Sequence, residues 1–201
     1  MMDVLGEYFY IMGAGLSRER RISRAVEALE AAVALKGDHW KAWNLLGLCY
    51  YRLGEFSKAR RAWNRSIRLQ QWDNPALEYM YDMTNPAFIE ILRRYNKALE
   101  LAAGKKYRQA GDMLERTLPG LPPLVSYVNL LGLCRYGQGK TKTALKLWSH
   151  AAELDRENPD AVRYIRSAAV ESNRTAAALP GLFGRIFRRL TGADISTEDD
   201  V

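Results

Sequence analysis

The chain has 201 residues, of which 48% are hydrophobic and 26% are charged, a composition typical of a folded globular chain and not of a disordered one. The formal net charge of +7 favours acidic partners, but it is too diffuse to establish nucleic-acid binding. No apolar run is long enough for a membrane-spanning helix, and residues 1–16 lack the basic start of a signal peptide, so we expect a cytoplasmic protein.

A six-residue segment occurs twice without change. Residues 44–49 read Asn-Leu-Leu-Gly-Leu-Cys, and residues 129–134 repeat them 85 positions later. An identical hexamer at this separation indicates internal duplication. The hexamer also holds both cysteines, Cys49 and Cys134, and no metal-ligand spacing surrounds either of them. We therefore expect both thiols to be small buried hydrophobes in a reducing compartment.

The first predicted pair of helices spans about residues 6–39, and a second pair with larger side chains spans residues 40–73. In each pair, four residues at i, i+3, i+4 and i+7 share one face of the first helix. A glycine on that face lets the second helix approach closely, and Gly54 ends the first helix of the second pair. The residues of this pattern are Phe9, Met12, Gly13, Leu16, Ala25 and Leu29 in the first pair, and Trp43, Leu46, Gly47, Tyr50, Ala59 and Trp63 in the second.

The spacing W-x2-L-G-x2-Y, followed by A-x3 and an aromatic residue, resembles the tetratricopeptide repeat, a helix–turn–helix unit of about 34 residues. The resemblance covers about residues 6–173 and implies an all-α array of helical hairpins, an α-solenoid. Residues 125–158 carry the pattern again. Residues 91–124 keep only the second-helix residues, because Arg94, Lys97 and Ala98 stand where Trp, Leu and Gly are expected.

Half a repeat separates the two pairs of units. Residues 75–83 predict one short helix, stopped by Thr84-Asn85-Pro86, and residues 159–173 predict its counterpart. The sequence thus predicts two modules, residues 1–85 and 86–173, each of two repeats and a closing helix, with about ten helices in total. A closing helix is expected because the last repeat would otherwise expose its apolar face. A tail follows at residues 174–201.

The resemblance implies that the inner face of each first helix binds a peptide or a helix of another protein. Tyrosine offers contact area at low entropic cost, and an asparagine amide can pair with a peptide backbone. The leucines on this face could instead pack against neighbouring repeats. Tyr10, Ala14 and Leu45 stand where a clamp for chaperone C-termini would need Lys and Asn, which disfavours that partner. The candidate binding residues are Tyr10, Lys41, Asn44, Leu48, Tyr51, Arg52, Tyr95, Asn129, Leu133 and Tyr136.

The tail predicts a short amphipathic basic helix at residues 182–190, followed by a polar and acidic end. A helix this short needs a surface to stabilise it. That surface is the array itself, a partner or second copy, or an anionic membrane, and the sequence leaves these open. The residues of this helix are Leu182, Phe183, Arg185, Ile186, Phe187, Arg188, Arg189 and Leu190.

The sequence contains no phosphate-binding glycine loop, no metal spacing and no Ser/His/Asp arrangement. We therefore expect neither catalysis nor a cofactor, and we interpret the chain as a non-enzymatic adaptor for another protein. The alternative is a peripheral membrane-associated or nucleic-acid-associated protein held by the basic tail helix and by outer arginines. The outer arginines are Arg60, Arg61, Arg65 and Arg68, for which a solvated surface is the ordinary explanation.

Overall fold

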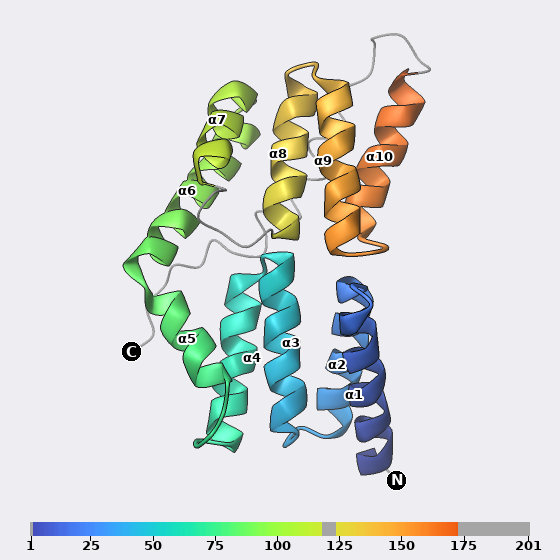
Figure 1. Ribbon diagram of the computed structural model, residues 1–201, viewed down its shortest axis with the longest axis vertical. Coiled ribbons are helices and arrows are strands. Elements are labelled where there is room, and N and C mark those ends of the chain that lie inside the picture. Colours follow the sequence, from blue (N-terminus) through green and yellow to red (C-terminus); the bar gives the residue numbers. More distant parts are fainter. Residues whose placement is uncertain (1, 118–123, 173–201) are drawn as a thin grey trace.

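The computed structural model describes residues 2–117 and 124–172, which form ten α-helices and no β-strand (Figure 1). The all-α repeat architecture and the helix count expected from the sequence are confirmed. The predicted tail helix lies outside the described residues. The helices are α1 (Met2–Arg18), α2 (Ile22–Leu35), α3 (Trp40–Leu53), α4 (Phe56–Leu69), α5 (Ala76–Thr84), α6 (Pro86–Ala103), α7 (Tyr107–Thr117), α8 (Val125–Gly137), α9 (Thr141–Leu154) and α10 (Pro159–Ser172).

Helical hairpins form around a glycine that faces a tryptophan. A Cβ added at Gly47 would lie 2.4 Å from the ring nitrogen of Trp63, and one at Gly132 would lie 2.3 Å from that of Trp148. Both indoles are fully buried. Each ring nitrogen donates a hydrogen bond to the carbonyl three residues before the glycine, at 3.1 and 3.2 Å. The predicted close approach therefore joins α3 to α4 and α8 to α9 in the same way.

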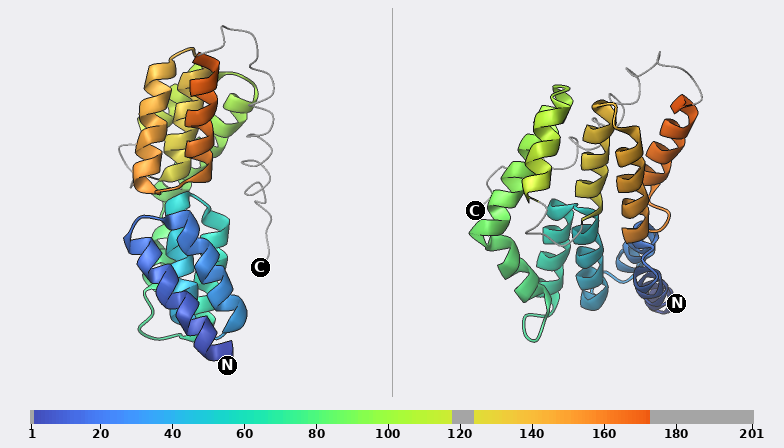
Figure 2. Two further views of the ribbon diagram at one scale, coloured as in Figure 1. Left: turned by 90° about the vertical axis from the view of Figure 1, so that its right-hand side faces the viewer. Right: turned by 45° about the horizontal axis from the view of Figure 1, so that its top comes forward.

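The order of the helices across the molecule reverses between α5 and α6, which follow one another end to end with a bend (Figure 1). Helices α1 to α5 stand side by side in one row, and α6 to α10 return in a second row above it, so that α10 lies over α1 and α2 (Figures 1 and 2). Asn85 lies at the reversal, where its Oδ1 accepts a hydrogen bond from the N–H of Ala87 at 2.9 Å and caps α6. Pro86 occupies the first position of α6, which disfavours a helical Asn85.

Hydrogen bonds join the first repeat to the last. The Asp155 carboxylate is fully buried and accepts from the Ser23 N–H at 3.1 Å, the Ser23 hydroxyl at 2.6 Å and the Asn158 amide at 3.0 Å. The backbone N–H of Arg156 donates to the Arg20 carbonyl at 2.7 Å. These contacts connect the α9–α10 turn to the α1–α2 turn, 132 residues apart between Ser23 and Asp155. They fix the second row on the first.

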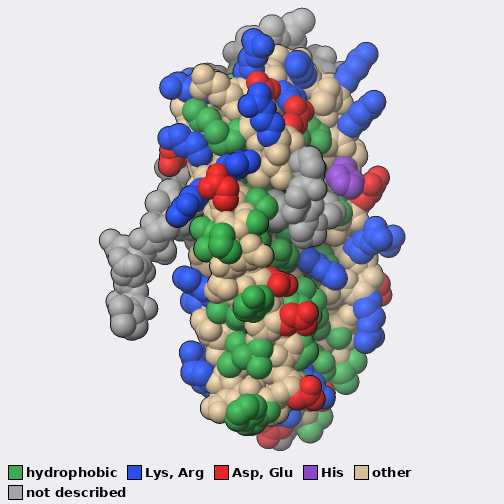
Figure 3. Space-filling model, turned by 60° about the vertical axis from the view of Figure 1, so that its left-hand side comes forward, with side chains coloured by type: hydrophobic (Ala, Val, Ile, Leu, Met, Phe, Trp, Pro, Cys, Tyr) green, Lys and Arg blue, Asp and Glu red, His purple; other side chains and the backbone are tan. Residues whose placement is uncertain are grey.

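Closing helix α5 covers the end of the first row on one side only. Ala76 is fully buried against that row, and the Tyr79 ring lies 5.1 Å from the Trp63 ring. On its outer side, Leu77 and Tyr81 are 46% and 77% exposed. Viewed from the side of α5 and α6, hydrophobic side chains gather over the lower part of the molecule, and Lys and Arg side chains are frequent over the upper part (Figure 3).

Helix α6 replaces the poorly matched first helix expected in residues 91–124, and it begins at Pro86. Ala98, in the place expected for glycine, is fully buried. The Tyr95 ring stacks on the Tyr127 ring of α8, with centroids 4.2 Å apart. An alanine therefore suffices for close packing here, because no tryptophan from α7 fills this position.

Candidate functional site: a groove across three helices

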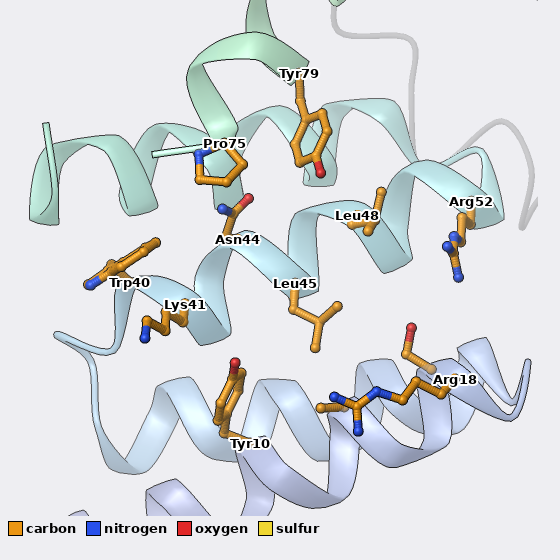
Figure 4. A pocket seen from close by; sticks show the side chains of 12 residues that line it. Tyr10, Arg18, Trp40, Lys41, Asn44, Leu45, Leu48, Arg52, Pro75 and Tyr79 are labelled. Carbon is orange, nitrogen blue, oxygen red and sulfur yellow. The ribbon is translucent and has the colours of Figure 1, made fainter. Parts of the chain in front are cut away.

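A groove with a volume of about 480 Å³ crosses α1, α3 and α5 (Figure 4). It lies on the inner face of α3, opposite the face that packs against α4. The residues that line it are Tyr10, Ala14, Ser17 and Arg18 from α1, Trp40, Lys41, Asn44, Leu45, Leu48 and Arg52 from α3, and Pro75 and Tyr79 at α5.

Helical spacing explains how α3 lines the groove with one face and packs against α4 with the other. Lys41, Leu45, Leu48 and Arg52 follow one another by four, three and four residues, which places them on one face. Leu46, Gly47 and Tyr50 point to the opposite face and are buried. The lining leucines are only partly buried, although they pack at the edge of the core. A partner could therefore contact the same leucines that support the first row.

The groove carries positive charge without a compensating carboxylate. Arg18, Lys41 and Arg52 line it, and its lining contains no Asp or Glu. All three side chains are exposed, and among the described residues none of them has an ion-pair partner. The Lys41 ammonium lies 5.5 Å from the centroid of the Trp40 ring. Figure 4 shows Arg18 and Arg52 toward one end and Lys41 toward the other, with Leu45 and Leu48 between them.

Asn44 lines the groove, but its amide group has a structural role. Its Nδ2 donates to the Oδ1 of Asn74 at 3.2 Å, and that same Oδ1 accepts from the Ala76 N–H at 3.0 Å. The Asn74 amide also donates to the Ser66 hydroxyl at 3.0 Å. Asn44 therefore holds the start of α5 in place. Its own Oδ1 is buried and has no hydrogen-bond partner among the described residues.

Tyr51 was predicted to lie on the binding face, but it is half-buried and does not line the groove. Its ring packs against Phe56, Phe88 and Trp63, with centroids 5.5, 6.0 and 5.9 Å away. Burial, with a smaller effect from the Asp82 charge, raises the pKa of its hydroxyl. Phe56 and Trp63 belong to α4, and Phe88 belongs to α6, which the reversal brings against this side of α3. Tyr51 thus belongs to the joint between the two rows.

The four candidate residues of the second row do not extend the groove. Asn129 is 6% exposed and donates to the Asn158 Oδ1 at 3.2 Å, as Asn44 does to Asn74. Asn129 and Tyr95 line a separate space of about 170 Å³ between the rows. Leu133 and Tyr136 are buried in a cluster around Trp148 of α9. All four side chains are buried: Tyr95 on α6, and the other three on α8, which helices cover on several sides.

The sequence interpretation omitted one wall of the groove. Pro75 and Tyr79 come from the start of α5, which was assigned only a closing role, and Trp40 comes from the first turn of α3. The recurrence of Tyr79 at Tyr164 marked the position as part of the duplicated pattern. That signal does not say whether the side chain faces a groove or the core, and Tyr164 is in fact buried.

The cysteines are free and buried, as expected from the sequence. Burial raises the pKa of the Cys49 thiol to about 11 and that of the Cys134 thiol to about 12. Both thiols are therefore protonated near neutral pH, and this makes them weak nucleophiles. Within residues 2–117 and 124–172, no group of three or more His, Cys, Asp or Glu side chains could hold a metal ion. No helix in these ranges is long and apolar enough to cross a membrane.

Comparison with known proteins gives one family match. Residues 15–75 match the family described as tetratricopeptide repeat. No curated protein matches the chain. The chain is similar to the solved TPR domain of P58(IPK), with 19% identity and a TM-score of 0.47 over 84% of this chain and 46% of that one. It therefore spans about half the length of that domain.

Two further solved structures are similar over most of their length. MamA from residue 41 to its end, from Desulfovibrio magneticus RS-1, has 15% identity and a TM-score of 0.38, covering 96% of this chain and 97% of that one. YrrB, described as a TPR protein with an unusual peptide-binding site, has 15% identity and a TM-score of 0.37, covering 79% and 90%. At these TM-scores the likeness says nothing about individual site residues.

Proposed function

We propose that this chain, whose residues 15–75 match the tetratricopeptide repeat family, is a non-enzymatic adaptor that binds a segment of another protein in the groove across α1, α3 and α5. One observation carries the proposal. The groove holds three cationic side chains around an apolar centre, and no carboxylate lines it. A groove of this kind favours a peptide whose apolar residues are flanked by acidic ones.

The spacing of the cations in the groove indicates what kind of peptide segment would bind there. Lys41 and Arg52 are 11 positions apart on one helix, which corresponds to about 16 Å along α3. An extended peptide covers that distance in about five residues. We therefore propose a segment with two or three apolar residues between carboxylates at that separation. Tyr10 and Tyr79 offer ring area to the apolar residues from the two walls.

The alternative of a peripheral membrane or nucleic-acid function rests on the tail helix, which lies outside the described residues, and on the outer arginines. A membrane or a nucleic acid would use a broad basic surface, whereas the lining of the groove places apolar side chains between its cations. The concave site thus supports the adaptor function better.

Affinity capture with charge-reversed variants tests the proposal. We expect proteins retained by the immobilised chain to fall at least about ten-fold with Lys41→Glu/Arg52→Glu, because two attractive charge pairs become repulsive. The matched control is Arg93→Glu/Lys97→Glu, which makes the same charge change at two exposed residues of α6 that do not line the groove. Circular dichroism confirms that each variant is folded. Equal capture by the groove variant and the wild-type chain would refute this binding site.

A further inference from the structure

A second groove lies on the opposite side of α3, between α2 and α4, with a volume of about 650 Å³. Its floor is apolar and includes Val33, Trp43 and Leu46. It is separate from the groove across α1, α3 and α5, because the two share no lining residue. The complete lining is Glu30, Val33, Ala34, Trp43, Leu46, Tyr50, Lys58, Arg61, Ala62, Arg65 and Arg68.

Four cations form a row along one wall of this outer groove. Successive members are three, four and three residues apart, so they share one face of α4 over about 15 Å. Among the described residues, none of the three arginines has an ion-pair partner. The one acidic lining residue, Glu30, already accepts a hydrogen bond from the Tyr50 hydroxyl. The row consists of Lys58, Arg61, Arg65 and Arg68.

The chain itself contains a segment of complementary charge. Residues 194–200 read Asp-Ile-Ser-Thr-Glu-Asp-Asp and contain four carboxylates and no Lys or Arg. In an extended conformation, the six steps from Asp194 to Asp200 span about 20 Å, close to the length of the row. Ile195 is the apolar residue within this segment, and the groove floor would accept such a side chain.

We propose that the outer groove between α2 and α4 binds the acidic segment 194–200 of the same chain. The 22 positions between Ser172 and Asp194 (194 − 172) reach about 70 Å when extended, whereas a chain of this size has a radius of gyration of about 16 Å. A segment tethered in this way acts at an effective concentration near the millimolar range. The acidic segment of the same chain therefore has an advantage over an acidic segment of a free partner.

Charge arrangement distinguishes the two grooves. The outer groove presents its cations in a continuous row, which matches the consecutive carboxylates Glu198, Asp199 and Asp200. In the groove across α1, α3 and α5, the cations stand at the two ends. Each groove also contains one lysine, Lys58 in the outer groove and Lys41 in the other. A lysine-specific reaction can therefore report which groove holds the segment.

Carbodiimide coupling, which joins an amine directly to a carboxylate, tests the proposal in the full chain. All samples carry Glu55→Gln, because the Glu55 carboxylate lies 2.6 Å from the Lys58 ammonium and would compete. After digestion, mass spectrometry quantifies links from residues 194–200 to each lysine. We expect links within single molecules to Lys58, reduced about five-fold by Arg65→Glu. Arg60→Glu is the matched control, since Arg60 is exposed on the same helix but does not line the groove.

Any of three results would overturn the proposal. The links could form mainly with Lys41, they could occur only between molecules, or Arg60→Glu could reduce them as much as Arg65→Glu does. A second measurement tests the proposal independently of the coupling reaction. Neutralising the segment with Glu198→Gln/Asp199→Asn/Asp200→Asn should shift NMR resonances of the α4 arginine side chains and leave those of Arg18 and Arg52 in place. Unchanged α4 resonances would contradict the proposal.

Discussion

Replacing Gly47 by alanine tests the glycine–tryptophan packing of the α3–α4 hairpin, which the α8–α9 hairpin repeats. The new Cβ would lie 2.4, 2.5 and 2.8 Å from three atoms of the Trp63 indole, where normal contacts are about 3.5 Å or more. The indole is 1% exposed, and the rings of Tyr51 and Tyr79 lie 5.9 and 5.1 Å from it. It would have to shift by roughly 1 Å and give up its 3.1 Å hydrogen bond to the Asn44 carbonyl.

The expected cost follows from three contributions. Overpacking costs about 1–3 kcal/mol, and the lost hydrogen bond costs about 1 kcal/mol. The higher helix propensity of alanine offsets about 1 kcal/mol of this destabilisation. The free energy of unfolding should therefore fall by about 1–3 kcal/mol in Gly47→Ala, and also in Gly132→Ala, whose Cβ would meet Trp148 in the same way.

Urea denaturation followed by circular dichroism measures this change, and Gly15→Ala is the control. Gly15 also lies inside a helix, but nothing stands within 4 Å of its added Cβ. The same substitution there should raise the free energy of unfolding by about 0.5–1 kcal/mol, through helix propensity alone. Stabilisation of similar size at Gly47 and Gly15 would refute the steric explanation of the repeated glycine.

Three other predictions follow from buried polar groups and thiols. Asn74→Ala should lower the urea midpoint by an amount equivalent to about 1–3 kcal/mol, because it leaves the Asn44 amide and the start of α5 without their partner; an unchanged midpoint would exclude this role. By the same assay, Ser23→Ala should lower the free energy of unfolding by about 1 kcal/mol and Asp155→Ala by about 2–3 kcal/mol. Amide hydrogen exchange should become faster in both the α1–α2 turn and the α9–α10 turn. Faster exchange in only one of these turns would show that the bonds do not join the rows. Cys49, whose pKa is raised to about 11 by burial, should react slowly with a disulfide reagent at pH 8 and at the normal rate in urea, and fast reaction of the folded chain would contradict its burial.

The duplicated hexamer shows how one sequence acquires two environments. Asn44 and Asn129 both donate to an asparagine at the start of a closing helix, and Trp63 and Trp148 make equivalent hydrogen bonds. These contacts are internal to each module, so the repeated residues reproduce them. The leucines differ, because Leu48 remains partly exposed in the groove while Leu133 is buried.

Part of the candidate site was predictable, and part was not. Helical periodicity placed Tyr10, Lys41, Leu48 and Arg52 on the inner faces of their helices, and all four line the groove. The same periodicity placed Tyr51 there, but its ring packs against two rings of α4 and against Phe88 of α6, which leaves it half-buried outside the groove. For a residue near the edge of a helical face, the neighbouring helices decide whether its side chain is buried or exposed. Some of those helices are distant in the sequence.

The hairpins could be predicted from the sequence because the pattern that forms them is short-range: a glycine or alanine on one helix, a large side chain on the next, and a break between them within about 34 residues. The reversal between α5 and α6 and the hydrogen bonds from Ser23 to Asp155 became visible only in the folded chain. That reversal places α8 among helices on several sides and leaves the inner face of α3 open beside α1 and α5. Whether a helix face is a surface or a core depends on such long-range contacts, which local periodicity does not encode.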